Sequence, residues 1–475
     1  MRVLRSLPWA WAALALALAP HHAAHAASEY EVEMGIVNTH RSVKLDPSVQ
    51  HIPLDEAQSH LRPPPPRVPN MFDIFVGLSV FRDGYRCAKT MVTGFQRATH
   101  PERLYFGVVD QVNPSDDKCI EEFCKMSAKT FPGKGDCPYR AQIRIDERLA
   151  DDSRGPTLAR HYQQKLLRDE EFCLQLDGHS IFTNKWDENI IAEWMRIGNE
   201  MAENGDNAPP YSLPHLCTTI RGAGNMVRNE GASMITHPKW PQLSALWGAG
   251  LSFSKCHAER RVLIDSHTLW MFDGEEFLRS SHLWTHGYDL YSPSPLGSVV
   301  YHNYSKVPAR FEHVKVDQMK KKTETTQTRN RFRLITGQDF VGDVDAREMR
   351  KFGFGNVRSF DDYLAFSGVT FEEGKKDNDT CRQLHWVPYR NATEVELIVG
   401  GGWKLHPAVA PPVPEVRTLP NPNGPDEPVQ PQGADMHAKA GAGAEADTAA
   451  EALPVDAKNK KTGAAAGVPQ PLADQ

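Results

Sequence analysis

The sequence has 475 residues, of which 24% are charged and 40% hydrophobic, and its formal net charge is −6. This length allows one large globular domain with tails, or two domains. The net charge is small, and no stripe of Lys and Arg interleaved with aromatic residues occurs, which argues against a nucleic-acid-binding protein. We therefore expect no nucleic-acid partner.

The first residues have the pattern of a secretory signal. Arg2 and Arg5 precede an apolar stretch at 7–19, and Ala24-His25-Ala26 is a small-x-small cleavage pattern. The apolar stretch is shorter than the roughly 20 residues that cross a bilayer, so a cleaved signal peptide at 1–26 is favoured over a retained membrane anchor. The pattern predicts the secretory pathway (ER or Golgi lumen) or secretion as the destination, with no stable membrane span unless the segment stays as an anchor.

The cysteines and the sequons agree with that compartment. None of the eight cysteines shows paired CxxC spacing, so disulfides are expected and a zinc ribbon is not. The sequons at Asn378 and Asn391 fit glycosylated surface loops. A third, at Asn303, lies against candidate site residues and is expected to be unmodified.

Both ends of the chain differ in composition from its middle. Residues 27–70 are polar and end in four consecutive prolines, which predicts a stiff extended linker. From about Pro407 onward few large apolar residues remain, so we expect residues 407–475 to be disordered. The folded domain is then predicted at 71–406.

Strand and helix patterns alternate within that domain. Apolar β-rich runs occur at 72–78, 104–109 and 172–176, and helical patterns occur at 86–99 and 158–169. This alternation predicts an α/β fold with a mainly parallel, Rossmann-like sheet and helices on both faces. Ligands bind such sheets beyond the carboxyl ends of the strands. The Gly/Asn-rich stretch at 221–233 and the segment after Trp240 are expected to be loops over that edge.

The clearest local signal is the run Leu176-Asp177-Gly178-His179 at the end of a predicted strand. Alternate residues of an extended chain project from the same side, so Asp177 and His179 can converge on one cation, and Gly178 leaves room for a diphosphate. The alternative is a strand-end turn in which the aspartate is a cap. His302 follows another short apolar run and is a candidate third ligand, or else an ordinary surface histidine.

Two neighbouring carboxylates, Glu275 and Glu276, follow the apolar run that ends at Phe272. A carboxylate near a reacting sugar can bind hydroxyl groups. Paired acids at the start of a helix also interact favourably with the helix dipole, so a structural role is the alternative.

Taken together, these stretches resemble the GlcNAc-transferase family, the enzymes similar to hydroxyproline-polypeptide N-acetylglucosaminyltransferase. The resemblance runs from about Asp73 to Ser367. Its most specific part is the run at 264–267 followed by those at 274–276 and 283–293. The other matching stretches are 74–83, 106–111, 159–160, 174–182, 186–187, 354–359 and 363–369.

The resemblance implies a retaining GT-A glycosyltransferase that uses UDP-GlcNAc and Mn²⁺ or Mg²⁺. The metal ligands would be Asp177, His179 and His302. It further implies that Ser79, Arg82 and Arg160 contact the nucleotide or diphosphate, with a structural salt bridge or cap as the alternative for each. Gly248 and Gly250 would form the floor of the sugar pocket, beside Trp247. Glu275 and Glu276 would lie near the sugar and the acceptor, and Trp284 or His286 would line the acceptor side. Core packing is the alternative for Trp284, for His286 and for the segment at 247–250.

The acceptor implied is a protein or glycan hydroxyl, with protein hydroxyproline as one form. The best-known family members are cytoplasmic, whereas this chain carries a secretory signal, so its acceptor need not be theirs. Two alternatives from other classes are a metal-dependent hydrolase with the same Asp/His/His set around a metal-bound water and an inactive carbohydrate-binding descendant of the fold.

Overall fold

The computed structural model describes residues 34–37, 42–205, 212–236, 238–302, 309–400 and 403. All of them belong to the first of two compact units of the chain, Met1–Val429. The predicted signal peptide, the C-terminal tail and Asn303 lie outside the described residues. Among the residues described, no helix is both long and apolar enough to cross a membrane.

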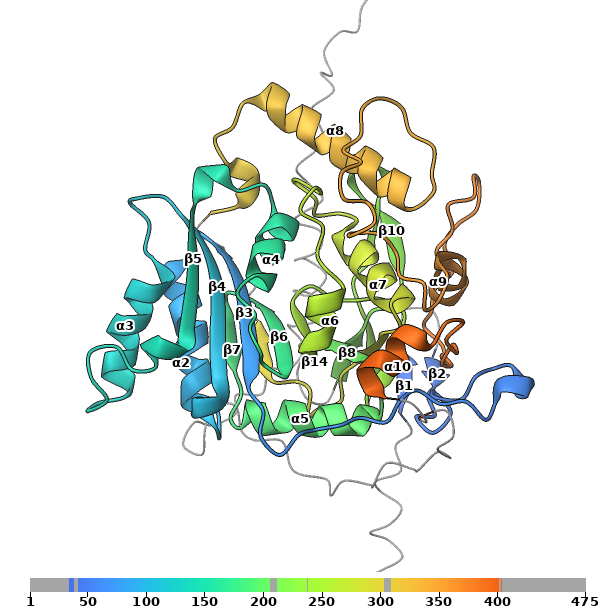
Figure 1. The fold of residues 1–475 in the computed structure, drawn as a ribbon, viewed down its shortest axis with the longest axis horizontal. Helices are drawn as coiled ribbons and strands as arrows, with labels where there is room; N and C mark the ends of the chain where they lie inside the picture. Colours follow the sequence, from blue (N-terminus) through green and yellow to red (C-terminus); the bar gives the residue numbers. More distant parts are fainter. Residues whose placement is uncertain are drawn as a thin grey trace, which may run out of the picture. The chain divides into compact units, whose positions relative to one another are not determined.

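The centre of the unit is one eight-stranded sheet (Figure 1). Its strands are β3 (Ile74–Phe81), β4 (Leu104–Val112), β5 (Ile143–Leu149), β6 (Phe172–Asp177), β8 (Ala202–Gly205), β13 (Gln242–Ser244), β14 (Leu251–Lys255) and β15 (Asp289–Ser292). Their spatial order is β13-β15-β8-β14-β6-β3-β4-β5. The pairs β6-β3, β3-β4, β4-β5 and β15-β8 are parallel, whereas β14 runs antiparallel to both neighbours and β13 runs antiparallel to β15.

Helices cover both faces of this sheet. The helices of the described residues are α2 (Gly84–Arg97), α3 (Cys119–Thr130), α4 (Pro156–Gln164), α5 (Trp186–Ile197), α6 (Cys256–Arg261), α7 (Glu275–Thr285), α8 (Gln318–Ile335), α9 (Phe360–Ser367) and α10 (Thr393–Val399). Apolar residues of α2, α3 and α5 pack with alternate residues of β3, such as Val76 and Leu78. On the opposite face, Phe75 packs with Cys256 of α6 and with Leu166, just after α4. Burial on both faces explains why β3 and β6 are almost continuously apolar.

The α/β architecture with a mainly parallel sheet core and helices on both faces was predicted from the sequence and is confirmed. The three predicted strands correspond to β3, β4 and β6, and the two predicted helices correspond to α2 and α4. Helix α4 ends at Gln164 rather than at 169. There Lys165 N donates a tight-turn hydrogen bond to Tyr162 O, and Leu166 and Leu167 turn toward the sheet.

The segment at 221–233 is not the irregular loop that its glycines and asparagines suggested. It contains most of an antiparallel hairpin, β10 (Thr219–Arg221) with β11 (Val227–Asn229), and it ends at the start of β12 (Ser233–Thr236). Burial of its few apolar residues stabilises the hairpin, because Val227 is fully buried against α7. The glycines lie in the turns around the strands, where Gly224 and Gly231 have positive φ.

Part of the predicted linker at 27–70 belongs to the folded unit. Strands β1 (Gly35–Val37) and β2 (Ser42–Lys44) join β12 and β9 (Ser212–His215) in a sheet of order β2-β1-β12-β9. Met34 and Ile36 are buried beside Ile235. The composition of the segment is polar on average, but alternate apolar residues are enough for a short strand to cover an existing core.

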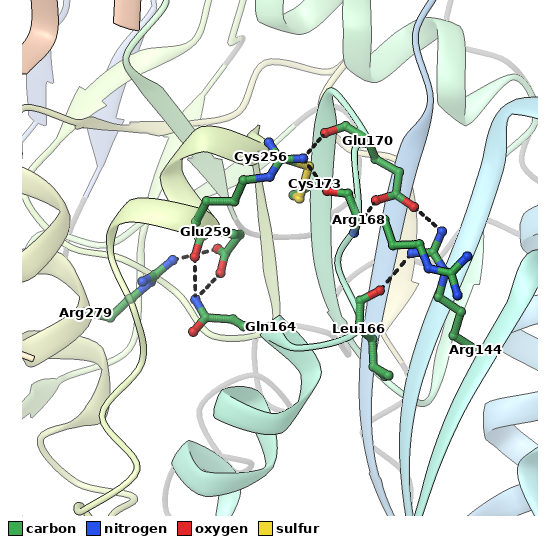
Figure 2. The surroundings of a disulfide bond; sticks show 10 residues. Arg144, Gln164, Leu166, Arg168, Glu170, Cys173, Cys256, Glu259 and Arg279 are labelled. Atoms are coloured by element: carbon green, nitrogen blue, oxygen red, sulfur yellow. Dashed lines mark hydrogen bonds and ion pairs between the residues drawn. A yellow bond between two sulfur atoms is a disulfide. The ribbon is translucent and has the colours of Figure 1, made fainter. Parts of the chain in front are cut away.

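All eight cysteines form disulfides: Cys87–Cys119, Cys124–Cys137, Cys173–Cys256 and Cys217–Cys381. Figure 2 shows the third of these, which ties β6 to the start of α6 between two buried ion pairs, Arg144 with Glu170 and Arg279 with Glu259. The strand that carries the candidate metal ligand Asp177 is therefore covalently fixed to the helix layer.

Candidate metal and donor site

Asp177 and His179 stand at a tight turn where the central strand β6 ends. A Cβ atom added to Gly178 would lie 2.6 Å from Val80 Cγ2, so the turn requires glycine there. Thr90 of α2 fixes the other side of the turn: its Oγ1 lies 2.8 Å from the carbonyl oxygen of Ser180 and accepts a hydrogen bond from Ser180 N at 3.0 Å. Nothing in the sequence distinguished Thr90, because it lies in the middle of an amphipathic helix.

A small two-stranded sheet brings His302 to the same place. Strand β16 (Val300–His302) pairs antiparallel with β7 (Ser180–Phe182), and His302 lies opposite Ser180. His302 Nε2 is 3.0 Å from Asp177 Oδ2, and the His302 and His179 ring centroids are 4.7 Å apart. One potential ligand atom from each of Asp177, His179 and His302 lies within 4.8 Å of the others. The structure thus brings together the three residues named from the sequence.

The protonation states favour a cation. Burial alone would raise the pKa of Asp177, but the hydrogen bond from His302 and the charges of His302 and Arg160 outweigh it and hold the pKa at about 2. Burial also lowers the pKa of His179 below its ordinary value. An ionised carboxylate and a neutral imidazole are the forms that bind metals, and this mixed oxygen and nitrogen set fits Mn²⁺.

Arg160 connects the candidate metal ligands to α7. Its side chain is buried, with Nη1 2.5 Å from Glu275 Oε1 and Nη2 3.4 Å from Asp177 Oδ1. Burial opposes the charge of Arg160, but the two carboxylates outweigh burial and raise its pKa. Burial raises the pKa of Glu275, and Arg160 opposes that rise. The sequence predicted contacts of Arg160 with the nucleotide or diphosphate, and in the structure it is a positive charge held between two acids.

The residues named at the end of β3 are held by protein partners. Ser79 lies beside Asp177 in the strand register, and its Oγ donates to Gln163 Oε1 at 2.7 Å. Arg82 forms a two-pronged ion pair with Asp116, Nε to Oδ2 at 2.7 Å and Nη2 to Oδ1 at 2.8 Å. Gln163 and Asp116 had no sequence signal of their own.

The loop at 247–250, with Gly248 and Gly250, lies between β6 and α7. Gly250 O accepts a hydrogen bond from Asp177 N at 3.4 Å, and Ala249 N donates to Glu276 Oε1 at 3.1 Å. Gln175 Nε2 donates to Ala249 O at 2.7 Å. The loop therefore contacts both the metal-ligand strand and the second of the two glutamates.

Trp284 does not line an open acceptor side. It is 1% exposed, and its ring stacks on Phe366 in the core beneath α7 and α9. Trp284 follows Phe277 by seven positions in α7. This is close to two helical turns, so both side chains lie on the buried face of the helix. His286 is half-buried, and its Nδ1 bonds the carbonyl oxygen of His282 at 2.7 Å.

The fold and the site together define an α/β protein with a candidate divalent-metal site at the carboxyl ends of its parallel strands. The family model described as Glycosyltransferase (GlcNAc) matches residues 73–135 and 126–373, which is more than half of the chain. The chain belongs to this family. The glycosyltransferase family predicted from the sequence is thereby confirmed.

No curated protein matches the chain. Among solved structures, GalNAc-T7 with UDP, GalNAc and Mn²⁺ is similar at 12% identity and a TM-score of 0.41, over 63% of this chain and 57% of that one. The chain therefore spans little more than half the length of that enzyme's structure. The mannosyltransferase PcManGT from Pyrobaculum calidifontis, in complex with GDP-Man and Mn²⁺, is similar at 12% identity and a TM-score of 0.33, over 60% of this chain and 69% of that one.

Proposed function

We propose that this protein is a metal-dependent retaining glycosyltransferase that moves N-acetylglucosamine from UDP-GlcNAc to a hydroxyl group of a protein or glycan. The observation that carries the proposal is the convergence of Asp177, His179 and His302 beside the buried Arg160. The family's description, Glycosyltransferase (GlcNAc), supports N-acetylglucosamine as the sugar in this proposal. A bound Mn²⁺ or Mg²⁺ would neutralise charge on the departing UDP.

Other side chains around the candidate site supply charged groups for binding the donor and the acceptor. Arg160 adds positive charge on the same side as the metal ligands, and Glu276 presents a carboxylate from the first turn of α7. In a retaining transfer with front-side attack, the acceptor oxygen bonds to the sugar carbon as the bond from that carbon to the phosphate breaks. The acceptor proton passes to the departing UDP phosphate, so no dedicated side-chain base is needed.

We also propose that the protein works in the secretory pathway. Four disulfides that use every cysteine are expected of a protein in an oxidising compartment and are rare in the cytosol. The candidate signal peptide agrees with this destination.

A panel of UDP-sugars, each incubated with the full chain with and without Mn²⁺, tests the proposed reaction. We expect slow Mn²⁺-dependent hydrolysis of UDP-GlcNAc in preference to the other donors, and its loss in Asp177→Ala. The control is His313→Ala, since His313 is exposed and outside the candidate site. Metal-dependent UDP binding without turnover of any donor would instead indicate an inactive descendant. Hydrolysis of unrelated esters without UDP binding would indicate a metal-dependent hydrolase.

A further inference from the structure

We propose that Glu203 is a positioning residue of the donor site, which holds the loop at 247–250 in place through Ser252 and the indole of Trp247. The proposal rests on the glycosyltransferase function proposed above. Glu203 lies in β8, two strands away from β6, and it contacts none of the candidate metal ligands. Its effect on the reaction would therefore be transmitted through other residues.

A directed chain of hydrogen bonds joins Glu203 to the loop. Trp247 Nε1 donates to Ser252 Oγ at 2.9 Å, and Ser252 Oγ also hydrogen-bonds Glu203 Oε1. An indole N–H can only donate, so the serine oxygen accepts that bond and its single hydrogen donates to Glu203. Trp247 and Glu203 are 2% and 1% exposed, so water does not replace either partner.

The loop at the other end of this chain touches the candidate site twice. Gly250 O accepts from Asp177 N, next to the metal-ligand carboxylate, and Ala249 N donates to Glu276. A shift of the Trp247 ring would move the backbone that makes both contacts. A misplacement of about 1 Å in an active site is enough to cost large factors in rate.

The surroundings of Glu203 explain why the protonation state of its carboxyl group can change near neutral pH. Ser254, which lies opposite Glu203 in the pairing of β14 with β8, faces the same carboxylate as Ser252, and both serines lower its pKa. Burial raises the pKa of Glu203 to about 7, with Arg279 of α7 lowering it and Glu259 of α6 raising it. Burial raises the pKa of the neighbouring Tyr288, and the charge of Glu203 adds to that rise. An ionised carboxylate accepts a stronger hydrogen bond than a neutral one, so the link to Ser252 tightens as the pH rises through neutrality.

Variant kinetics with UDP-GlcNAc and Mn²⁺ test the proposal on the full chain. We expect Glu203→Leu and Trp247→Phe each to lower kcat/KM by about tenfold, the loss of one buried hydrogen bond to a charged network. The double variant should lose no more than either single variant, because both changes break the same chain. The matched control is Trp186→Phe, which removes an equally buried indole donor, 2.9 Å from Gly94 O, on the other side of the sheet.

The pH profile gives a second readout that a merely structural role would not change. Wild-type kcat/KM should rise with pH through about 7, whereas Glu203→Gln, which keeps an acceptor for Ser252 but cannot ionise, should lack this rise. If Glu203→Leu yields too little folded protein to assay, the pH profile of Glu203→Gln and the kinetics of Trp247→Phe still test the proposal.

Additive losses in the double variant, wild-type kinetics in Trp247→Phe, or an unchanged pH profile in Glu203→Gln would each overturn the proposal. Failure of the wild-type protein to bind UDP with Mn²⁺ is a separate outcome, which would refute the proposed function itself.

Discussion

At the scale of single residues, the charge balance around Arg160 shapes the candidate site. One guanidinium faces Asp177 and Glu275, and all three groups are shielded from solvent to a large degree. Its position on α4 follows from the helix start, where Gly155 has a φ of 97° and Pro156 occupies the first turn. The arginine compensates two acids that would otherwise repel each other and the diphosphate of the proposed donor.

Removal of that charge should destabilise the protein in a pH-dependent way. In Arg160→Met, Glu275 is left buried without its cation, which is expected to cost about 3 kcal/mol in the free energy of unfolding. Because the folded-state pKa of Glu275 is already raised and would rise further, the folded state would bind the extra proton, and the deficit should be larger at pH 8 than at pH 5.

Urea unfolding at the two pH values measures this deficit. Arg82→Met is the control, since the more exposed Arg82–Asp116 pair should contribute under about 1 kcal/mol. A deficit for Arg160→Met that is equal at both pH values would show that Glu275 does not carry it.

The three candidate metal ligands that sequence reasoning found share one property: each stands at or just beyond the end of an apolar strand. Asp177, His179 and His302 were recognisable because strand ends of an α/β sheet form the ligand-binding edge. Thr90, Gln163 and Glu203 were not recognisable, since they lie inside helices or strands and act only through partners distant in sequence. Trp284 could not be assigned from the sequence, because an aromatic residue near acids fits a binding site and a core equally well, and the structure places it in the core.

At the scale of elements, strands β6, β3 and β4 of the parallel core could be predicted, and the rest of the sheet, including β5, could not. The three predicted strands are buried on both faces and leave long apolar runs, whereas β5 alternates apolar with charged residues. Strands β8 and β13 are only four and three residues long. They also contain polar side chains, for example Glu203 and Gln242, which form hydrogen bonds in the folded protein that their sequence does not indicate. Strand β1 was missed for the same reason, as its three residues carry too little pattern.

The role of β1 can be tested at Ile36, which is 1% exposed. Ile36→Ala should lower the free energy of unfolding by about 2–4 kcal/mol, because it opens a cavity against Ile235 and the Cys217–Cys381 disulfide. Denaturant unfolding measures the change, with Leu54→Ala as the control, since Leu54 is 80% exposed in the same N-terminal part of the chain. Equal stabilities for the two variants would mean that this segment is a linker after all.

At the scale of the whole molecule, the disulfides link distant parts of the chain in a way that spacing alone could not predict. Cys217–Cys381 joins residues 164 positions apart, whereas Cys124–Cys137 closes a loop of 13. The first connects the segment before β10 to the C-terminal part of the folded unit.

These two bridges should contribute differently to stability. In the chain-entropy account, loss of Cys217–Cys381 should cost about 2 kcal/mol more than loss of Cys124–Cys137, because the longer bridge restricts the unfolded chain more. Double serine variants of each pair, compared by urea unfolding under non-reducing conditions, measure the difference. A larger loss from the 13-residue loop would contradict this expectation.

The central claim is that Asp177, His179 and His302 hold the divalent metal that binds the donor diphosphate. Calorimetric titration of UDP into the full chain, with and without Mn²⁺, tests it most directly in the wild-type protein, Asp177→Ala, His302→Ala and the control His313→Ala. We predict Mn²⁺-dependent UDP binding in the wild-type and control proteins and its loss in the other two variants, with unchanged melting behaviour. Wild-type affinity for UDP with Mn²⁺ in either Asp177→Ala or His302→Ala would contradict the account.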